Sequence, residues 1–187
     1  MEVKPIRNKV EILKMKEFLR KKGSGYELLF VMGLNTALRI GDLLSLKVAD
    51  VTYGDGKIVD AICLKEGKTG KLKRMPINES LKNTLCGYLA AHPGSKRSAP
   101  LFTSRKGGTL SRTHAWRVLK AAGEAVGLSN IGTHTLRKTF GYHAYRESGK
   151  DIGLVQRLLN HSTGANTLRY IGIDREKMDD TYMRLNL

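Results

Sequence analysis

One stretch of the chain, residues 130–172, holds most of the side chains that could carry out a reaction. His134 and Arg137 lie three positions apart, so a helix would present both on one face. His161 follows a second helical run, and Tyr170 comes after a Gly-Ala-Asn break in that pattern. An arginine fork fits two phosphate oxygens, a histidine can donate to a third or move a proton, and a deprotonated tyrosine can attack phosphorus. These side chains together predict a phosphodiester as the target.

The overall charge points to the same kind of target. The chain has 187 residues, which suits one domain, and its 33 Lys and Arg against 17 Asp and Glu give a net charge of +16. A folded domain this basic is typical of proteins that bind a polyanion, most often nucleic acid. A ribosomal or simply soluble basic protein is the alternative on charge alone. No basic amphipathic helix stands out that would favour a membrane surface.

Cysteine usage and hydropathy indicate the compartment. Cys63 and Cys86 are too few for a disulfide scaffold and lack metal-ligand spacing. Cys63 lies in the apolar run AICL, where we expect it to be buried. The N-terminus has no hydrophobic signal region, and no apolar run approaches the length of a membrane span. These features predict a reduced, cytoplasmic location with no membrane association.

Apolar spacing and cap residues predict a mainly helical chain. Arg39 falls between two of the expected helices, where the core would hold it from behind while it faces outward; an ordinary surface arginine is the alternative. The tail is expected to be amphipathic through Met178, Tyr182 and Leu185. Helices are expected over 9–22, 26–36, 40–46, 79–91, from a cap at Ser111 or Thr113 to about 126, 135–147, 152–160 and from 174 onward.

Residues 51–78 have a different pattern, with β-branched runs broken by Gly-Asp-Gly and Lys-Thr-Gly-Lys. Two turn signals between apolar runs predict a small antiparallel sheet of three strands. The second hairpin is crowded with basic residues: Lys65, Lys68, Lys71, Lys73 and Arg74. It is either a solvated hairpin tip or a finger that reaches into DNA with one lysine at the reaction. The segment alone leaves both interpretations open.

Further basic residues follow the hairpin in two groups. One group lies in the loop at 94–110 and the other in the helix after it. We predict that these residues position DNA through its phosphates, although several are expected to be merely solvated. They are Arg105, Lys106, Arg112 and Arg117.

Four segments in order carry a resemblance to a known family: TALRIGDLLSL, GKTGKLKRMPI, HTLRKTFGYH and LLNHSTGANTLRYI. Together they resemble the catalytic domain of tyrosine recombinases, the phage-integrase family, from about residue 8 to 172. The resemblance implies one catalytic domain over 1–187, mainly α-helical with a small three-stranded antiparallel sheet. It implies no metal and no cofactor, and the sequence shows no carboxylate cluster that would hold a metal.

The resemblance assigns roles to the phosphate-binding and nucleophilic residues. Arg39 and Arg137 would grip the non-bridging oxygens of the scissile phosphate. Tyr170 would attack phosphorus, which gives a 3′-phosphotyrosyl link and a free 5′-hydroxyl. Because that link conserves the energy of the broken bond, rejoining needs no ATP. Tyr182, in the tail, is the competing nucleophile.

The remaining roles concern proton transfer. Lys68 lies eight residues before Pro76, which matches the hairpin lysine of the family, and it would protonate the leaving 5′-oxygen. His134 would accept a proton or a hydrogen bond, and His161 would donate to a non-bridging oxygen. Such a concentration of positive groups stabilises charge that develops on phosphorus.

The chain departs from the family pattern in two places. Lys138 follows Arg137 where many relatives have a histidine, and we expect Lys138 to contact DNA. The catalytic pattern begins almost at Met1, so we expect no N-terminal core-binding domain, as in the short fimbrial phase-variation invertases and short prophage integrases. The tail at 174–187 is a candidate for docking on a neighbouring protomer.

The partners implied by the resemblance are double-stranded DNA, further copies in a tetramer on paired sites, and accessory DNA-bending proteins. The chain is then a bacterial or phage-encoded site-specific recombinase or integrase. Three alternatives remain: a catalytically weak DNA-binding regulator or prophage remnant with this fold, DNA relaxation like that of a type IB topoisomerase, and a general basic RNA-binding protein.

Overall fold

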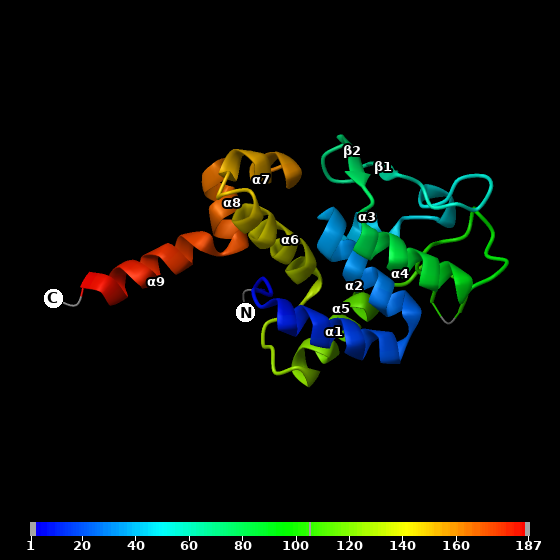
Figure 1. Ribbon diagram of the computed structural model, residues 1–187, viewed down its shortest axis with the longest axis horizontal. Helices are drawn as coiled ribbons and strands as arrows, with labels where there is room; N and C mark the ends of the chain where they lie inside the picture. Colours follow the sequence, from blue (N-terminus) through cyan, green and yellow to red (C-terminus); the bar gives the residue numbers. More distant parts are fainter. Residues whose placement is uncertain (1–2, 105, 186–187) are drawn as a thin grey trace.

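The computed structural model describes residues 3–104 and 106–185, so the predicted DNA contact Arg105 lies outside the described residues. Within these ranges the chain is mainly helical, as predicted (Figure 1). The elements in order are α1 (Lys9–Lys22), α2 (Ser24–Thr36), α3 (Ile40–Leu44), the 3-10 turn η1 (Val48–Asp50), β1 (Ala61–Lys65), β2 (Leu72–Pro76), α4 (Glu79–Ala90), α5 (Arg112–Ala125), α6 (Thr133–Glu147), α7 (Ile152–Leu158), α8 (Gly164–Ile171) and α9 (Ile173–Leu185).

Side-chain caps define many of the helix starts. Asn78 caps α4 by accepting from the backbone N–H of Leu81, and Asp151 caps α7 in the same way. The predicted helices are found with boundaries within two residues of those expected. The prediction of a break at Gly-Ala-Asn is wrong, because these residues form the first turn of α8. Thr163 caps that turn through the N–H of Asn166, and the cap outweighs the weak helix propensity of glycine.

The predicted sheet of three strands is wrong by one strand. β1 and β2 pair antiparallel from Ala61 opposite Pro76 to Lys65 opposite Leu72. The segment before β1 makes only an isolated bridge between Thr52 and Ile58 around the Gly-Asp-Gly turn. The η1 turn occupies the residues just before this bridge, so too little extended chain is left to pair with β1.

The prediction that Cys63 is buried is also wrong. Alternate residues of a strand point to opposite faces, and the sheet here has one buried face. Ile62 takes the inward position and is fully buried, which places Cys63 on the exposed face. An apolar run of four residues does not reveal which of the two alternating sets faces the core.

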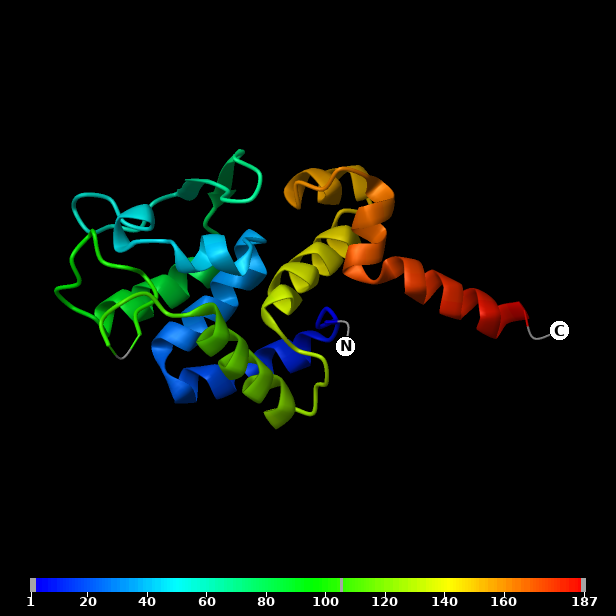
Figure 2. The same ribbon diagram turned by 180° about the vertical axis from the view of Figure 1, so that it is seen from behind.

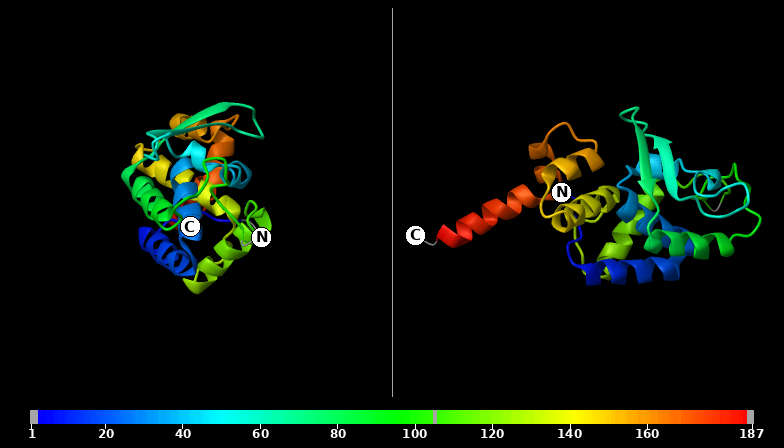
Figure 3. Two further views of the ribbon diagram at one scale, coloured as in Figure 1. Left: turned by 90° about the vertical axis from the view of Figure 1, so that its right-hand side faces the viewer. Right: turned by 45° about the horizontal axis from the view of Figure 1, so that its top comes forward.

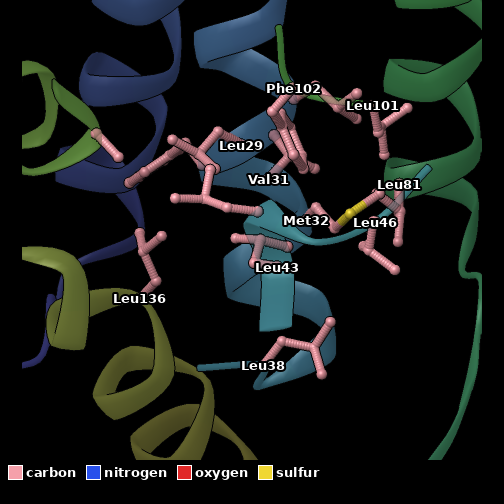
Figure 4. Close-up of a cluster of buried hydrophobic side chains, with 14 of the residues drawn as sticks. Leu29, Val31, Met32, Leu38, Leu43, Leu46, Leu81, Leu101, Phe102 and Leu136 are labelled. Atoms are coloured by element: carbon pink, nitrogen blue, oxygen red, sulfur yellow. The ribbon is translucent and has the colours of Figure 1, made fainter. Parts of the chain in front are cut away.

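The main hydrophobic core surrounds α2. Leu29, Val31 and Met32 from this helix pack with Leu81 of α4, and Leu136 of α6 reaches the same cluster (Figure 4). Because α2 is apolar on nearly all sides, it is buried between its neighbours, as its sequence predicts. The core therefore fixes the end of α2, from which the chain continues to Arg39.

A second, smaller cluster joins α6, α7 and α8 through Tyr142, Val155, Leu159 and Ile171. Gly141 makes this packing possible, since a Cβ at this position would lie 2.7 Å from Ile171 and 3.0 Å from Leu159. The close approach seats α8 directly on α6. It therefore holds the helix that carries Tyr170 against the helix that carries Arg137.

The elements form two groups with a helix that projects from them. Figures 1 and 2 show α1 to α5 with the hairpin on one side and α6 to α8 on the other. The hairpin lies beside α7, and α9 extends away from the body of the molecule (Figure 3). Gly172 makes the turn between α8 and α9 with a φ of 78°, a conformation that favours glycine. No helix in the described ranges is long and apolar enough to span a membrane.

Candidate active site

Arg137 is the most deeply placed of the predicted site residues. It lies on α6 and is only 2% exposed. Its guanidinium donates to the backbone carbonyls of Ala37 and Leu159, which connects the end of α2 to the end of α7. Burial, together with the neighbouring Arg39, lowers the pKa of this guanidinium, although arginine remains charged. Arg137 therefore links the two groups of elements at the centre of the site.

Two residues adopt left-handed backbone conformations next to this centre. Ala37 has a φ of 55° and is fully buried, and Asn160 has a φ of 48°. Asparagine tolerates this region, whereas alanine in it costs about 1 kcal/mol. Ala37 precedes Arg39 by two positions, and Asn160 precedes His161 by one. Such strained positions are concentrated at functional sites in proteins.

Arg39 follows α2 and lies beside Arg137, as the sequence predicts. Its Nη1 is 3.0 Å from the Oε1 of Glu66, and the Nη1 of Arg137 is 3.8 Å from the same oxygen. Two guanidinium groups around one carboxylate oxygen form the geometry that also binds a phosphate oxygen. Glu66, which no sequence motif singled out, is fully buried where the hairpin turn begins.

Tyr170 lies on α8 with its hydroxyl directed toward His134. The distance from this hydroxyl to the His134 Nδ1 is 3.4 Å. Burial raises the pKa of the Tyr170 phenol, while the nearby Arg137 and Arg39 oppose that rise. The Nζ of Lys138 lies 5.3 Å from the centre of the tyrosine ring, in a cation–π arrangement.

His161 stands edge-on to Tyr170, with ring centres 4.9 Å apart. Its Nδ1 is 3.2 Å from the hydroxyl of Thr167, whose single proton is donated to the carbonyl of Thr163. The Thr167 oxygen is therefore an acceptor, and His161 must carry its proton on Nδ1. Burial lowers the pKa of His161 to about 4, with a further contribution from Arg137 and Arg39. In the free protein His161 is neutral near pH 7, with Nε2 able to accept.

This lowered pKa predicts a stability that depends on pH. An unfolded histidine has a pKa near 6.5. Between pH 6.5 and 4 the unfolded state therefore takes up a proton that His161 in the folded state does not, so the free energy of unfolding falls as pH falls. His134, whose pKa is lowered by burial and by Arg137, contributes with the same sign. Above pH 6.5 the contribution is constant.

We expect His161→Asn to show a shallower loss of stability than the wild type between pH 6.5 and 4. Denaturant unfolding at several pH values measures this difference. The matched control is His92→Asn, at the end of α4. Parallel curves for wild type and His161→Asn would contradict the neutral, half-buried state of His161.

The two hairpin lysines occupy different environments. Lys68 lies at the exposed tip, and its charge helps to lower the pKa of His134. Lys73, predicted to contact DNA, instead donates from Nζ to the carbonyl of Leu158 at 3.0 Å. Burial and the charge of Arg137 lower the pKa of Lys73 to about 8. The structure therefore brings to the site a second lysine, for which the sequence predicted only a DNA contact.

The other predicted DNA contacts differ in exposure. Arg112 lies against α3, where a Cβ on Gly41 would approach its Nη2 to 2.6 Å, so this arginine is next to the site. Lys138 is buried beside Tyr170. The remaining predicted contacts that the structure describes are exposed: Lys65, Lys71, Arg74, Lys106 and Arg117. None of these contacts is tested without DNA, and they stay predictions.

The site has the character of an anion-binding centre. Arg39, Arg137 and the two histidines lie around Tyr170, with Lys68 near His134 and Lys73 near Arg137. Across the described ranges, no cluster of three or more His, Cys, Asp or Glu could hold a metal ion. The arrangement suits a reaction in which a tyrosine attacks phosphorus and fixed cations stabilise the charge.

Comparison with known proteins places this site in a family. The model of the phage integrase family matches residues 8–177. The probable integrase/recombinase YoeC of Bacillus subtilis (strain 168) is 43% identical over 181 residues, which cover 96% of this chain and 95% of YoeC. Several curated Xer-type tyrosine recombinases are 28–34% identical, and the chain spans only 44–60% of their lengths.

Solved structures show the same fold. The crystal structure of XerA recombinase superimposes with a TM-score of 0.75 at 20% identity, over 99% of this chain and 65% of that one. The XerH site-specific recombinase bound to its difH substrate, in a pre-cleavage complex, gives 0.71 at 23% identity, over 97% and 55%. The fold is thus that of the tyrosine recombinases. The chain belongs to the phage integrase family.

Proposed function

We propose that this chain is a site-specific DNA recombinase that cleaves and rejoins strands through a 3′-phosphotyrosyl bond to Tyr170, without metal or ATP. The observation that carries the proposal is the position of Tyr170. Its hydroxyl is 3.4 Å from His134, and the pKa of its phenol responds to both Arg39 and Arg137. A nucleophile, a proton acceptor and two phosphate-binding arginines are therefore in one place.

The charge states suit attack by the phenol. A tyrosine has a pKa near 10 and must lose its proton to attack at neutral pH. The lowered pKa of His134 keeps its imidazole unprotonated near pH 7, and an unprotonated imidazole can accept that proton. The arginines that bind the phosphate also stabilise the phenolate. Electrostatic stabilisation of this kind is usually the largest single contribution to catalysis.

His161 needs a change of state to act as a donor. With Nδ1 bonded to Thr167, the Nε2 of neutral His161 is an acceptor. A bound phosphate brings negative charge close to the imidazole, which raises its pKa and favours the doubly protonated form. We therefore infer that His161 donates to a non-bridging oxygen only after DNA binds.

The leaving 5′-oxygen needs a proton. Replacing this oxygen by sulfur can show which of the two hairpin lysines supplies the proton. A sulfur in the bridging position leaves as a thiolate, since a thiol has a pKa near 8.5 and needs no general acid. We expect Lys68→Ala to lower cleavage of the oxygen substrate about 10²- to 10³-fold. Cleavage of the sulfur substrate is expected to be nearly restored, in single-turnover assays with both substrates.

Lys73→Ala is the matched control for this experiment. Its Nζ is held by the carbonyl of Leu158, so its loss should slow both substrates to a similar extent. Rescue of Lys73→Ala by sulfur, without rescue of Lys68→Ala, would make Lys73 the general acid instead.

We further propose that the chain acts as a tetramer on paired duplex sites, with accessory DNA-bending proteins as possible additional partners. Steering and non-specific affinity would come from the net charge of +16. The projecting α9 supports assembly. Its exposed apolar residues include Tyr182, 80% exposed, and Met183, 82% exposed, and a single copy leaves them in water. A neighbouring protomer that covers α9 would bury them.

The experiment that tests the function is a trap for the covalent intermediate. Duplexes from DNA that flanks the gene would carry a nick a few nucleotides beyond each candidate cleavage point. The short 5′-hydroxyl fragment then diffuses away and prevents rejoining. A protein–DNA adduct on a denaturing gel is the expected result. Relaxation of supercoils by single protomers would favour topoisomerase-like activity, and binding without any adduct would favour a DNA-binding regulator.

A further inference from the structure

Glu66 is a buried carboxylate to which the proposed chemistry gives no role. It follows β1 where the hairpin turn begins and is 0% exposed. A charged side chain so completely buried is rare unless it is paired and hydrogen-bonded. Here the carboxylate lies within the site itself, between the hairpin and the two arginines.

The hydrogen bonds and ion pairs that the structure describes for this carboxylate come from four groups that donate. Its Oε2 accepts from Thr69 Oγ1 at 2.8 Å and from Asn160 Nδ2 at 2.8 Å. Its Oε1 faces Arg39 Nη1 at 3.0 Å and Arg137 Nη1 at 3.8 Å. An ionised carboxylate accepts and cannot donate, so it suits this environment better than an amide of the same shape.

Each of the four donors is, or directly adjoins, a predicted catalytic residue. Two are the phosphate-binding arginines themselves. Thr69 follows Lys68 at the hairpin tip, and Asn160 precedes His161. The lysine, the arginines and the histidine are thus held relative to one carboxylate.

The backbone of Glu66 adds to this arrangement. Its carbonyl accepts from the N–H of Gly70, and its own N–H donates to the carbonyl of Lys71. These bonds close the turn that carries Lys68. On the other side of the turn, the N–H of Gly67 donates to the carboxylate of Asp42 in α3. The tip of the hairpin is therefore fixed to the elements that bear Arg39.

We propose that Glu66 is a positioning residue that sets Lys68 and His161 in register with Arg39 and Arg137, so that all four meet one phosphate. This inference rests on the proposed recombinase function. Glu66 acts from behind the arginines and has no exposed surface with which to touch DNA. Burial raises the pKa of its carboxyl. The hydrogen bonds from Asn160 and Thr69 and the charge of Arg39 together outweigh burial, so the pKa is lowered overall and the carboxylate stays ionised.

An opposite role for Glu66 is conceivable from the same contacts and gives an opposite result. If the carboxylate stood in for the scissile phosphate, it would compete with DNA for the arginines, and its removal would speed cleavage. If it positions the arginines, its removal slows cleavage. The sign of the change therefore separates the two roles.

The test is Glu66→Gln in the full chain, with cleavage of the nicked duplex measured in single turnover at saturating DNA. The amide keeps the size of the side chain but removes the charge that faces the arginines. We expect the saturated cleavage rate to fall about 10- to 100-fold, because small displacements of positioned groups have effects of this size. DNA affinity, measured separately at fixed salt, should change by no more than about twofold, since the many surface cations are untouched.

Glu27→Gln is the matched control. Glu27 is also a buried carboxylate that pairs with basic residues, but it accepts from Arg20 between α1 and α2. We expect this variant to lose stability and to keep its saturated cleavage rate. If loss of stability alone lowered the cleavage rate, the rate would fall in both Glu66→Gln and Glu27→Gln. That result would overturn the proposal.

Two single-link variants keep the test decisive if Glu66→Gln does not fold. Thr69→Val and Asn160→Gly each remove one hydrogen bond to the carboxylate, and glycine tolerates the left-handed backbone at position 160. Each should lower the saturated rate with little change in affinity. An unchanged or faster rate in these variants, or in a folded Glu66→Gln, would overturn the proposal. If the wild type itself gives no adduct, it is the recombinase function that fails.

Discussion

Tyr170→Phe is expected to abolish the covalent protein–DNA adduct while DNA affinity stays nearly unchanged. The substitution removes one oxygen and keeps the ring that packs against His161 and lies near Lys138. Without the hydroxyl no bond to phosphorus can form, so the adduct should fall below detection, at least about 10⁴-fold. The nicked-duplex trap on a denaturing gel measures the adduct, and equilibrium binding at fixed salt measures affinity.

The control for this variant is Tyr182→Phe. Tyr182 lies on α9 with 80% of its surface exposed, and α9 projects away from the rest of the molecule (Figure 1). We expect it to form the adduct as the wild type does. An adduct that persists in Tyr170→Phe and disappears in Tyr182→Phe would move the nucleophile to α9, and the protomer that supplies it would then have to be a neighbour.

The sequence predicted most of the helical fold because its signals were local. Cap residues such as Asn78 and Asp151 and the apolar periodicity of α1 and α2 act within a few residues, so they can be read without tertiary information. The predictions failed where contacts between residues far apart in the sequence determine the local structure. Whether the chain before Gly-Asp-Gly pairs with β1, and which face of β1 is buried, depends on what packs on the hairpin.

The site shows the same division. Arg39, Arg137, His161 and Tyr170 could be identified because their types and spacing are unusual for structural residues and match a known family. Glu66 could not, since a glutamate between lysines is ordinary on a surface. Its role depends on folding that places Asn160, 94 positions away, against it. Lys73 was predicted only as a DNA contact, because its bond to the carbonyl of Leu158 also joins residues far apart in the sequence.

Replacing each of the two arginines by alanine is expected to destabilise the protein to a different extent, even though both are needed for cleavage. Arg137→Ala leaves the buried carbonyls of Ala37 and Leu159 without their donor and removes one of the two guanidinium groups that face Glu66. Breaking a buried charged pair costs about 3–5 kcal/mol. Arg39 is more exposed and does not bond to the carbonyls that Arg137 holds, so we expect Arg39→Ala to cost about 1–3 kcal/mol.

Both variants should lose cleavage about 10³-fold or more at saturating DNA, with affinity reduced only several-fold. Each removes a donor aimed at charge that grows in the transition state, whereas ground-state affinity is spread over many phosphate contacts. Denaturant unfolding, saturated single-turnover cleavage and equilibrium binding separate the three effects. Equal losses of affinity and cleavage would reduce the arginines to DNA-positioning contacts.

Arg137→Lys tests whether the fork, and not only the charge, is what Arg137 supplies. A lysine ammonium keeps the charge near Glu66 but cannot present two fixed donors to the carbonyls that α2 and α7 offer. We therefore expect Arg137→Lys to recover part of the stability lost in Arg137→Ala and little of the cleavage. If Arg137→Lys restored both, charge alone would account for the residue. The connection that Arg137 makes between the two groups of elements would then be unnecessary for holding Tyr170 and Arg39 at one phosphate.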